Sequence, residues 1–273
     1  MFNAGALLIR KLFRQRKLIR KHNFRGYEIP VDLMLLTGGG PETFEAISDG
    51  HMANLKRHLE VDSGETIVEI GCGIGRDAIP LADIIGPTGK YLGVDIIKPS
   101  IDWCNQNITA RNKNFHFLHY DVRDQLHNMT GTTLTSEIRL PIEDGTVDKI
   151  ILQSVFTHMF PPDIKHYLKE FKRILKQDGL CYVTVFLYNN EILDSARKTN
   201  LTPFNLRFEY ELIEGVRLND PAYPTGAVAY TESFINTLLL ETGMQMARDP
   251  LKGSWSGYYS DADDGQDVLI LKS

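Results

Sequence analysis

The stretch from Val68 to Arg76 reads VEIGCGIGR, and it decides the predicted fold of the chain. A short apolar run leads into it, glycines follow at every second position (Gly71, Gly73 and Gly75), and a helical pattern comes directly after it. Glycine lets the backbone turn sharply and approach a ligand closely, because it has no Cβ atom. A strand, a glycine loop and a helix in this order are typical of the ligand-binding edge of an open α/β sheet.

Outside this loop the sequence alternates between strand patterns and helix patterns. The predicted strands are Thr66–Ile70, Tyr91–Val94, Phe115–Tyr120, Lys149–Gln153 and Leu180–Phe186. Helical patterns separate them, the clearest at Asp163–Lys176, and a helix at Thr231–Thr242 and a strand at Asp267–Lys272 close the chain. This alternation predicts right-handed βαβ units, which build a parallel sheet covered by helices on both faces.

Three segments lie outside this simple pattern. Residues 123–147 and 187–230 are long connections, and long loops inside a compact domain are usually functional or disordered. The leader combines a predicted basic amphipathic helix over Phe2–Arg25 with a helical pattern from Phe44 to Leu59. We therefore divide the chain into a leader or cap, residues 1–60, and an α/β domain, residues 61–273, in which residues 187–230 form a substrate-cap insert.

Composition excludes several classes of protein. Of the 273 residues, 42% are hydrophobic and 24% are charged, as in globular proteins, and no apolar run is long enough to cross a bilayer. Three scattered cysteines argue against a secreted, disulfide-linked fold, so we expect a cytoplasmic protein. Residues 1–27 carry eight Lys and Arg and no acid, whereas the remainder has 22 basic and 35 acidic residues, a net charge of −13. So acidic a body is a poor candidate for binding nucleic acid.

The basic arm has two interpretations that the sequence leaves open. A basic amphipathic helix can lie on an anionic membrane, which would make the protein membrane-peripheral through residues 1–25. The same helix can instead pack over the ligand pocket or against another subunit of a homo-oligomer.

The spacing of the glycine loop discriminates between ligands. A dinucleotide fingerprint needs a glycine three residues after Gly73, and Arg76 stands there. Glu69 would repel a pyrophosphate, but it suits a cationic ligand such as the sulfonium and ammonium of S-adenosylmethionine. Asp95 ends the next strand, where it can accept hydrogen bonds from both ribose hydroxyls, and Asp121 ends the third strand, where it can accept one from the adenine amino group.

With these features the chain resembles class I S-adenosylmethionine-dependent methyltransferases, and more narrowly a bacterial group found with glycan and secondary-metabolite biosynthesis. The segments that carry the resemblance are Gly38–Gly40, Glu69–Arg76, Ile101–Cys104, Asn107–Thr109, Ser154–Met159, Gly253–Trp255 and Gln266–Val268. The resemblance implies a Rossmann-like, seven-stranded sheet, mostly parallel, with its last strand antiparallel. It implies cofactor contacts from Glu69, Gly71, Gly73, Asp95, Ile96, Asp121, Val122 and Gln153. Gly75 and Arg76 of the glycine loop complete the predicted cofactor-binding set.

The expected reaction is transfer of a methyl group to a small polar acceptor, most simply a hydroxyl of a sugar, a glycan or a natural product. An alcohol is a weak nucleophile, so a positioned base is expected, and His158, just beyond the fourth strand, is the first candidate. His158 could instead cap the following helix or contact the cofactor. His51, Tyr188 and Tyr230 are alternative bases.

Several points stay open. Transfer to an amine and a non-catalytic cofactor-binding module remain alternatives to transfer to a hydroxyl.

No metal site is predicted, because Asp163 stands alone in the expected place. Trp103 is expected either along the adenine or in the core. The acidic loop Asp261–Gly265 lacks the spacing of an EF-hand and is predicted to be a solvated hairpin turn.

Overall fold

The computed structural model describes residues 20–124 and 128–273. Its strands are β1 (Lys21–Phe24), β2 (Tyr27–Pro30), β3 (Thr66–Ile70), β4 (Lys90–Asp95), β5 (Phe115–His119), β6 (Val147–Leu152), β7 (Leu175–Val185), β8 (Tyr210–Ile213), β9 (Val216–Leu218), β10 (Val228–Tyr230), β11 (Gln245–Met246) and β12 (Asp267–Lys272). Its helices are α2 (Val31–Met34), α3 (Pro41–His58), α4 (Ala78–Ile85), α5 (Lys98–Arg111), α6 (Pro161–Ile174), α7 (Asn190–Thr199) and α8 (Glu232–Thr242), with 3₁₀ turns η1 (Leu35–Thr37), η2 (Thr135–Glu137), η3 (Phe156–His158) and η4 (Pro224–Gly226).

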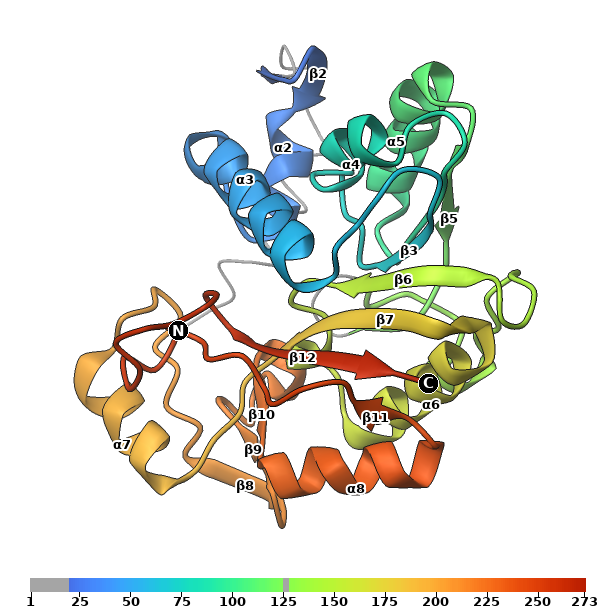
Figure 1. Ribbon diagram of the computed structural model, residues 1–273. Helices are drawn as coiled ribbons and strands as arrows, with labels where there is room; N and C mark the ends of the chain where they lie inside the picture. Colours follow the sequence, from blue (N-terminus) through green and yellow to red (C-terminus); the bar gives the residue numbers. More distant parts are fainter. Residues whose placement is uncertain (1–19, 125–127) are drawn as a thin grey trace.

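A seven-stranded sheet forms the centre of the molecule, with strand order β11-β12-β7-β6-β3-β4-β5 (Figure 1). Strands β3 to β7 are mutually parallel, and β12 pairs antiparallel with both β7 and β11. This confirms the expected Rossmann-like sheet with its last strand antiparallel. The parallel register brings the carboxyl ends of β3, β4, β5 and β6 to one edge, which is where open α/β sheets bind ligands.

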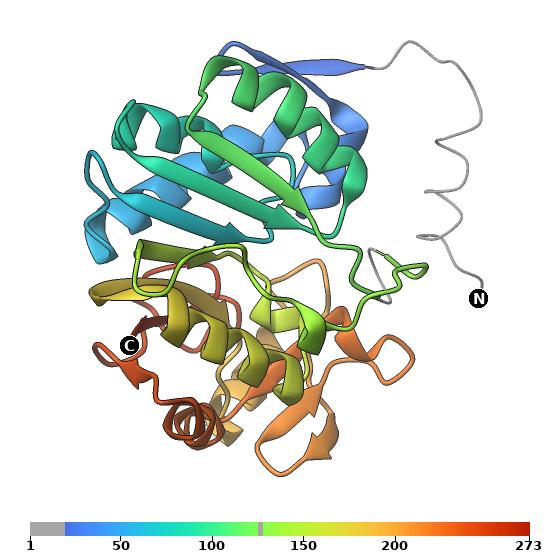
Figure 2. The same ribbon diagram turned by 90° about the vertical axis from the view of Figure 1, so that its right-hand side faces the viewer.

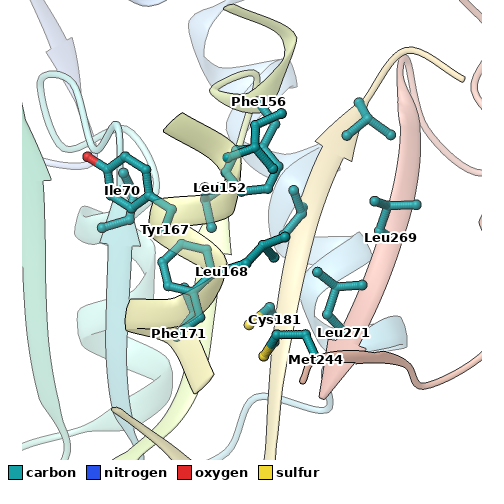
Figure 3. Close-up of a cluster of buried hydrophobic side chains, with 14 of the residues drawn as sticks. Ile70, Leu152, Phe156, Tyr167, Leu168, Phe171, Cys181, Met244, Leu269 and Leu271 are labelled. Atoms are coloured by element: carbon teal, nitrogen blue, oxygen red, sulfur yellow. The ribbon is translucent and has the colours of Figure 1, made fainter. Parts of the chain in front are cut away.

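Alternate side chains of the sheet enter two separate cores. On β3, Val68 and Ile70 join a cluster with α6 and α8, whereas Ile67 joins a cluster with α3, α4 and α5. Figure 3 shows the first cluster, in which Tyr167, Leu168 and Phe171 of α6 face the strands. Both faces are therefore covered, as the alternation of strands and helices predicted (Figure 2).

The predicted strands end and begin within two residues of the observed ones, except that β7 begins at Leu175, inside the helix predicted to run to Lys176. A larger correction is at the amino terminus. The helix predicted over Phe2–Arg25 is wrong at its end, because Lys21–Phe24 is a strand paired antiparallel with β2. Arg25 and Gly26 both have positive φ, 48° and 79°, as a two-residue hairpin turn requires, and Phe24 is buried against Phe44. Turn geometry and burial thus override helical periodicity. The rest of the predicted basic helix lies outside the described residues, and no described helix is long and apolar enough to cross a bilayer.

The insert at residues 187–230 is a folded unit, which its weak periodicity did not reveal. It contains helix α7 and a three-stranded antiparallel sheet in the order β10-β9-β8, and in Figure 1 it lies below the central sheet. A small aromatic core fixes it, since Trp255 packs edge-on against Phe186 and Phe208 at ring-centroid distances of 5.1 and 5.6 Å. The insert contacts the central domain where β10 packs against η3, just beyond β6.

Asp267, at the start of β12, joins the insert to the sheet. Its buried carboxylate accepts hydrogen bonds from the backbone N–H groups of Leu187 and Gly253 (2.8 Å each) and from Nε1 of Trp255 (2.7 Å). Two of the segments that carry the family resemblance, Gly253–Trp255 and Gln266–Val268, are therefore in direct contact. One carboxylate holds the beginning of the insert, the tryptophan of its core and the last strand together.

We predict that Asp267→Ala lowers the free energy of unfolding by about 3 kcal/mol or more, because three buried donors lose their acceptor. Urea denaturation followed by circular dichroism measures the change. Asp261→Ala is the matched control, since the Asp261 side chain is 75% exposed. Equal free energies for the two variants would contradict the structural role of Asp267.

Candidate active site

The glycine loop after β3 adopts a conformation that other residues would strain. Gly71 and Gly75 have φ values of 80° and 78°, in the left-handed region. A Cβ atom on Gly71 would lie 2.4 Å from Cγ2 of Val155, and one on Gly75 would lie 2.4 Å from Cδ1 of Ile108. The alternate glycines therefore allow both the turn itself and its close packing on α5 and on the segment that follows β6.

Asp95 fixes this loop to the end of β4. Its Oδ2 accepts a hydrogen bond from the N–H of Gly73 at 2.7 Å, and its Oδ1 accepts one from the N–H of Ile97 at 2.8 Å. The side chain is largely buried. The structure thus brings the second glycine and the predicted ribose acceptor into contact, although they are 22 residues apart.

Glu69, two residues before the first glycine of the loop, lies in a buried, acidic environment. Tyr91 donates a hydrogen bond to its Oε2, and both residues are buried. Burial, reinforced by the nearby carboxylate of Asp77, raises the pKa of Glu69 well above its usual range. A cation bound at this edge would therefore be stabilised by Glu69 and would favour its ionised form.

Asp121 follows β5 as predicted, but its carboxylate also organises its own loop. It accepts hydrogen bonds from Nδ2 of Asn128 (2.9 Å) and Oγ1 of Thr132 (2.9 Å), which lower its pKa. The next residue, Val122, is buried and forms a backbone bridge with Thr133. The carbonyl of Ile96, after β4, lies 3.2 Å from Nε2 of His119.

A cavity of about 540 Å³ lies beside the glycine loop, at the carboxyl ends of β6 and β7. Arg76 of the loop and Gln153 and Ser154 after β6 form one side, and Thr184 of β7 lies nearby. Nε of Arg76 and Nε2 of Gln153 are buried and have no hydrogen-bond partner among the described residues. Buried donors normally have partners, so these two point to a ligand.

Two walls of the cavity come from segments outside the glycine loop and the strand ends, and they include His51, one of the alternative bases. Helix α3 supplies His51 and Asn54, and the loop before β12 supplies residues 263–266. Asp264 accepts hydrogen bonds from Asn54 (2.8 Å) and from the hydroxyl of Tyr182 (2.6 Å). The acidic loop predicted as a solvated turn is therefore partly a cavity wall, and only contacts between distant residues reveal this.

The predicted bases occupy different environments. His158 lies on η3, where its Nδ1 is 2.9 Å from the carbonyl oxygen of Thr225, and it does not line the cavity described above. Tyr230 is fully buried, and its hydroxyl donates a hydrogen bond to the carbonyl of Met159. This contact gives Tyr230 a structural role. Tyr188, partly buried, lies under the guanidinium of Arg217. His158 as proton acceptor remains a prediction.

The ring of Trp103, on α5, lies tilted against the ring of Tyr27 with centroids 6.3 Å apart, and it is partly buried. Within residues 20–124 and 128–273, no three His, Cys, Asp or Glu side chains gather as a metal site would require.

Comparison with known proteins agrees with this geometry. Residues 67–179 match the model of a family described as a methyltransferase domain. The chain therefore contains a class I S-adenosylmethionine-dependent methyltransferase domain. Over 135 residues the chain is 27% identical to an arsenite methyltransferase of Aquipseudomonas alcaligenes, across 50% of this chain and 36% of the relative. It is 26% identical to a demethylmenaquinone methyltransferase of Lactobacillus johnsonii, across 45% of this chain and 44% of that relative. The chain thus spans less than half the length of these two curated relatives.

Solved structures show the same fold. An S-adenosylmethionine-dependent methyltransferase from Aquifex aeolicus superposes with a TM-score of 0.52 and 16% identity, over 88% of this chain and 96% of that one. The 1,6-didemethyltoxoflavin-N1-methyltransferase of Burkholderia thailandensis was solved with S-adenosylhomocysteine. It superposes with a TM-score of 0.52 and 16% identity, over 84% of this chain and 78% of that one. The structural match therefore extends beyond the family model to most of this chain.

The residues of this methyltransferase domain fit the cofactor. The glycine loop exposes backbone without a Cβ, and Asp95, the predicted ribose acceptor, lies directly beside it. Nε2 of Gln153 and Nε of Arg76 have no hydrogen-bond partner among the described residues, and these two donors would suit a carboxylate of the cofactor. S-adenosylmethionine, when bound, supplies the activated methyl group.

We predict that Asp95→Ala weakens the binding of S-adenosylhomocysteine about 10- to 100-fold, because hydrogen bonds to a charged acceptor contribute about 1.5–3 kcal/mol. Isothermal titration calorimetry measures the affinity, and Asp83→Ala, an exposed change on α4, is the control. Unchanged affinity in Asp95→Ala would show that the ribose lies elsewhere.

Proposed function

We propose that this chain transfers the methyl group of S-adenosylmethionine to a hydroxyl of a small polar acceptor, such as a sugar, a glycan or a natural product. The observation that carries the proposal is the cavity next to the glycine loop, which shares Arg76 and Gln153 with the proposed cofactor set. An acceptor in this cavity would lie beside the cofactor, so the reacting atoms would be held together.

The chemistry of the cavity wall supports a hydroxyl-rich acceptor. The wall combines the hydroxyls of Ser154 and Thr184 with the amides of Asn54, Gln153 and Gln266. Such groups both donate and accept hydrogen bonds, as do the hydroxyls of a carbohydrate. We propose that the insert at residues 187–230 takes part in covering the acceptor, because it folds against η3 directly after β6.

An amine acceptor is the second candidate, and the carboxylates at the cavity favour it. Asp263 and Asp264 both line the wall, where they would attract an ammonium or amine group. A structural neighbour is named as an N1-methyltransferase. Transfer to nitrogen needs no strong base, so the two candidates differ in what the chain must supply.

A release assay distinguishes these functions. The full chain is incubated with S-adenosylmethionine and separate panels of sugars, hydroxylated natural products and amines, and S-adenosylhomocysteine is quantified. We expect release with a hydroxylated acceptor. Release with amines alone would support the second candidate, and cofactor binding without release on any panel would indicate a non-catalytic module.

The basic arm bears on where such an acceptor is found. If residues 1–19 hold the enzyme at an anionic surface, the full chain will sediment with anionic liposomes and a chain starting at residue 20 will not. The truncation stops there because β1 begins at Lys21 and belongs to the folded domain. Equal partitioning of the two chains would end the membrane interpretation.

A further inference from the structure

A histidine and an aspartate from different helices form a pair beside the cavity. His51 lies in the middle of α3, and Asp77 immediately precedes α4. Nδ1 of His51 is 2.8 Å from Oδ2 of Asp77. The Asp77 side chain is 2% exposed and the His51 side chain 15%, so the carboxylate lies behind the imidazole and away from solvent.

The position of this pair relative to the cavity gives its two nitrogens different roles. His51 lines the cavity, together with Gln153 and Ser154 at the end of β6, whereas Asp77 does not. A carboxylate can only accept a hydrogen bond. Nδ1 therefore carries the proton of the neutral ring and donates a hydrogen bond to Asp77. Nε2, on the opposite side of the ring, then holds a lone pair that is available to a ligand in the cavity.

We propose that His51 is the proton acceptor for the substrate hydroxyl and that Asp77 is its positioning residue. The inference rests on the proposed transfer to a hydroxyl. The hydroxyl proton passes to Nε2 of His51 as the acceptor oxygen bonds the methyl carbon, and the electron pair of the broken carbon–sulfur bond stays on sulfur. The imidazolium so formed is stabilised by the carboxylate of Asp77, as in other histidine–carboxylate pairs.

The surroundings of Asp77 are consistent with a positioning role. Its second oxygen, Oδ1, is buried, has no hydrogen-bond partner among the described residues and lies 3.9 Å from Nε of Arg76. The hydrogen bond to His51 is therefore the main directional contact of this carboxylate. A buried acidic side chain with so few local partners is better explained by the histidine that it orients than by packing.

His51 fits the role better than His158. The Nδ1 of His158 faces a backbone carbonyl, that of Thr225, rather than a carboxylate, and His158 is not part of the cavity wall. A neutral carbonyl orients an imidazole but stabilises its protonated form less than a buried carboxylate does.

The kinetic test compares His51→Gln with the wild-type chain, using whichever hydroxylated acceptor gives the fastest release of S-adenosylhomocysteine. We expect kcat to fall about 10²- to 10⁴-fold, the usual contribution of a positioned base, with KM and the affinity for S-adenosylhomocysteine unchanged. His116→Gln, an exposed change on β5, is the matched control. Wild-type kcat in His51→Gln, or a loss confined to His158→Gln, would overturn the proposal.

The second test does not depend on turnover. In the full chain labelled with ¹⁵N-histidine and saturated with S-adenosylhomocysteine, nuclear magnetic resonance at mildly alkaline pH reports which nitrogen of His51 carries the proton. We expect the Nδ1–H form in the wild type and a shift towards Nε2–H in Asp77→Asn, whose amide can donate to Nδ1. An Nε2–H form in the wild type would refute the inference.

The two proposals fail in distinguishable ways. If the wild-type chain releases S-adenosylhomocysteine with amines alone, the proposed transfer to a hydroxyl is wrong and the base assignment falls with it. If it acts on a hydroxyl and His51→Gln acts equally well, only the base assignment is wrong.

Discussion

The carboxylate of Asp95 is the contact on which the site depends. It accepts the N–H of Gly73 and the N–H of Ile97, so one side chain joins the loop after β3 to the loop after β4. Neighbouring parallel strands place these loops side by side, and the glycines let the first one approach closely. This junction holds the loop that leads into α4 against the end of β4, and Arg76 of that loop lines the cavity.

A second carboxylate, Asp267, anchors the insert by hydrogen bonds, as Asp95 anchors the glycine loop. It joins residues 187, 253 and 255 to the start of β12, next to the loop that walls the cavity. The insert and the cavity wall are therefore anchored through the same strand. Stability of the insert and shape of the cavity are coupled, because the last strand of the sheet carries both.

The sequence predicts the sheet and the glycine loop well, since both depend on local patterns. Apolar runs mark β3 to β7 and β12, and the glycine spacing marks the loop between β3 and α4. The walls of the cavity depend instead on contacts between distant residues. Asn54 contacts Asp264 across 210 residues, and no local pattern in either segment indicates that partner. The insert at residues 187–230 was predicted, but its internal sheet was not, because the strands of that sheet are only three or four residues long.

Three buried acidic side chains lie at the edge of the sheet that holds the candidate site. Glu69, Asp77 and Asp95 are all nearly inaccessible, and uncompensated negative charge there is unfavourable. Each finds a different counterpart: a tyrosine hydroxyl for Glu69, backbone amides for Asp95 and an imidazole for Asp77. The first two face the glycine loop, where a cationic cofactor would offset their charge. The third faces α3, so that the proton taken up by His51 would offset its charge in the same way. If His51 is the base as proposed, separate carboxylates stabilise the positive charge of the cofactor before transfer and that of the imidazolium after it.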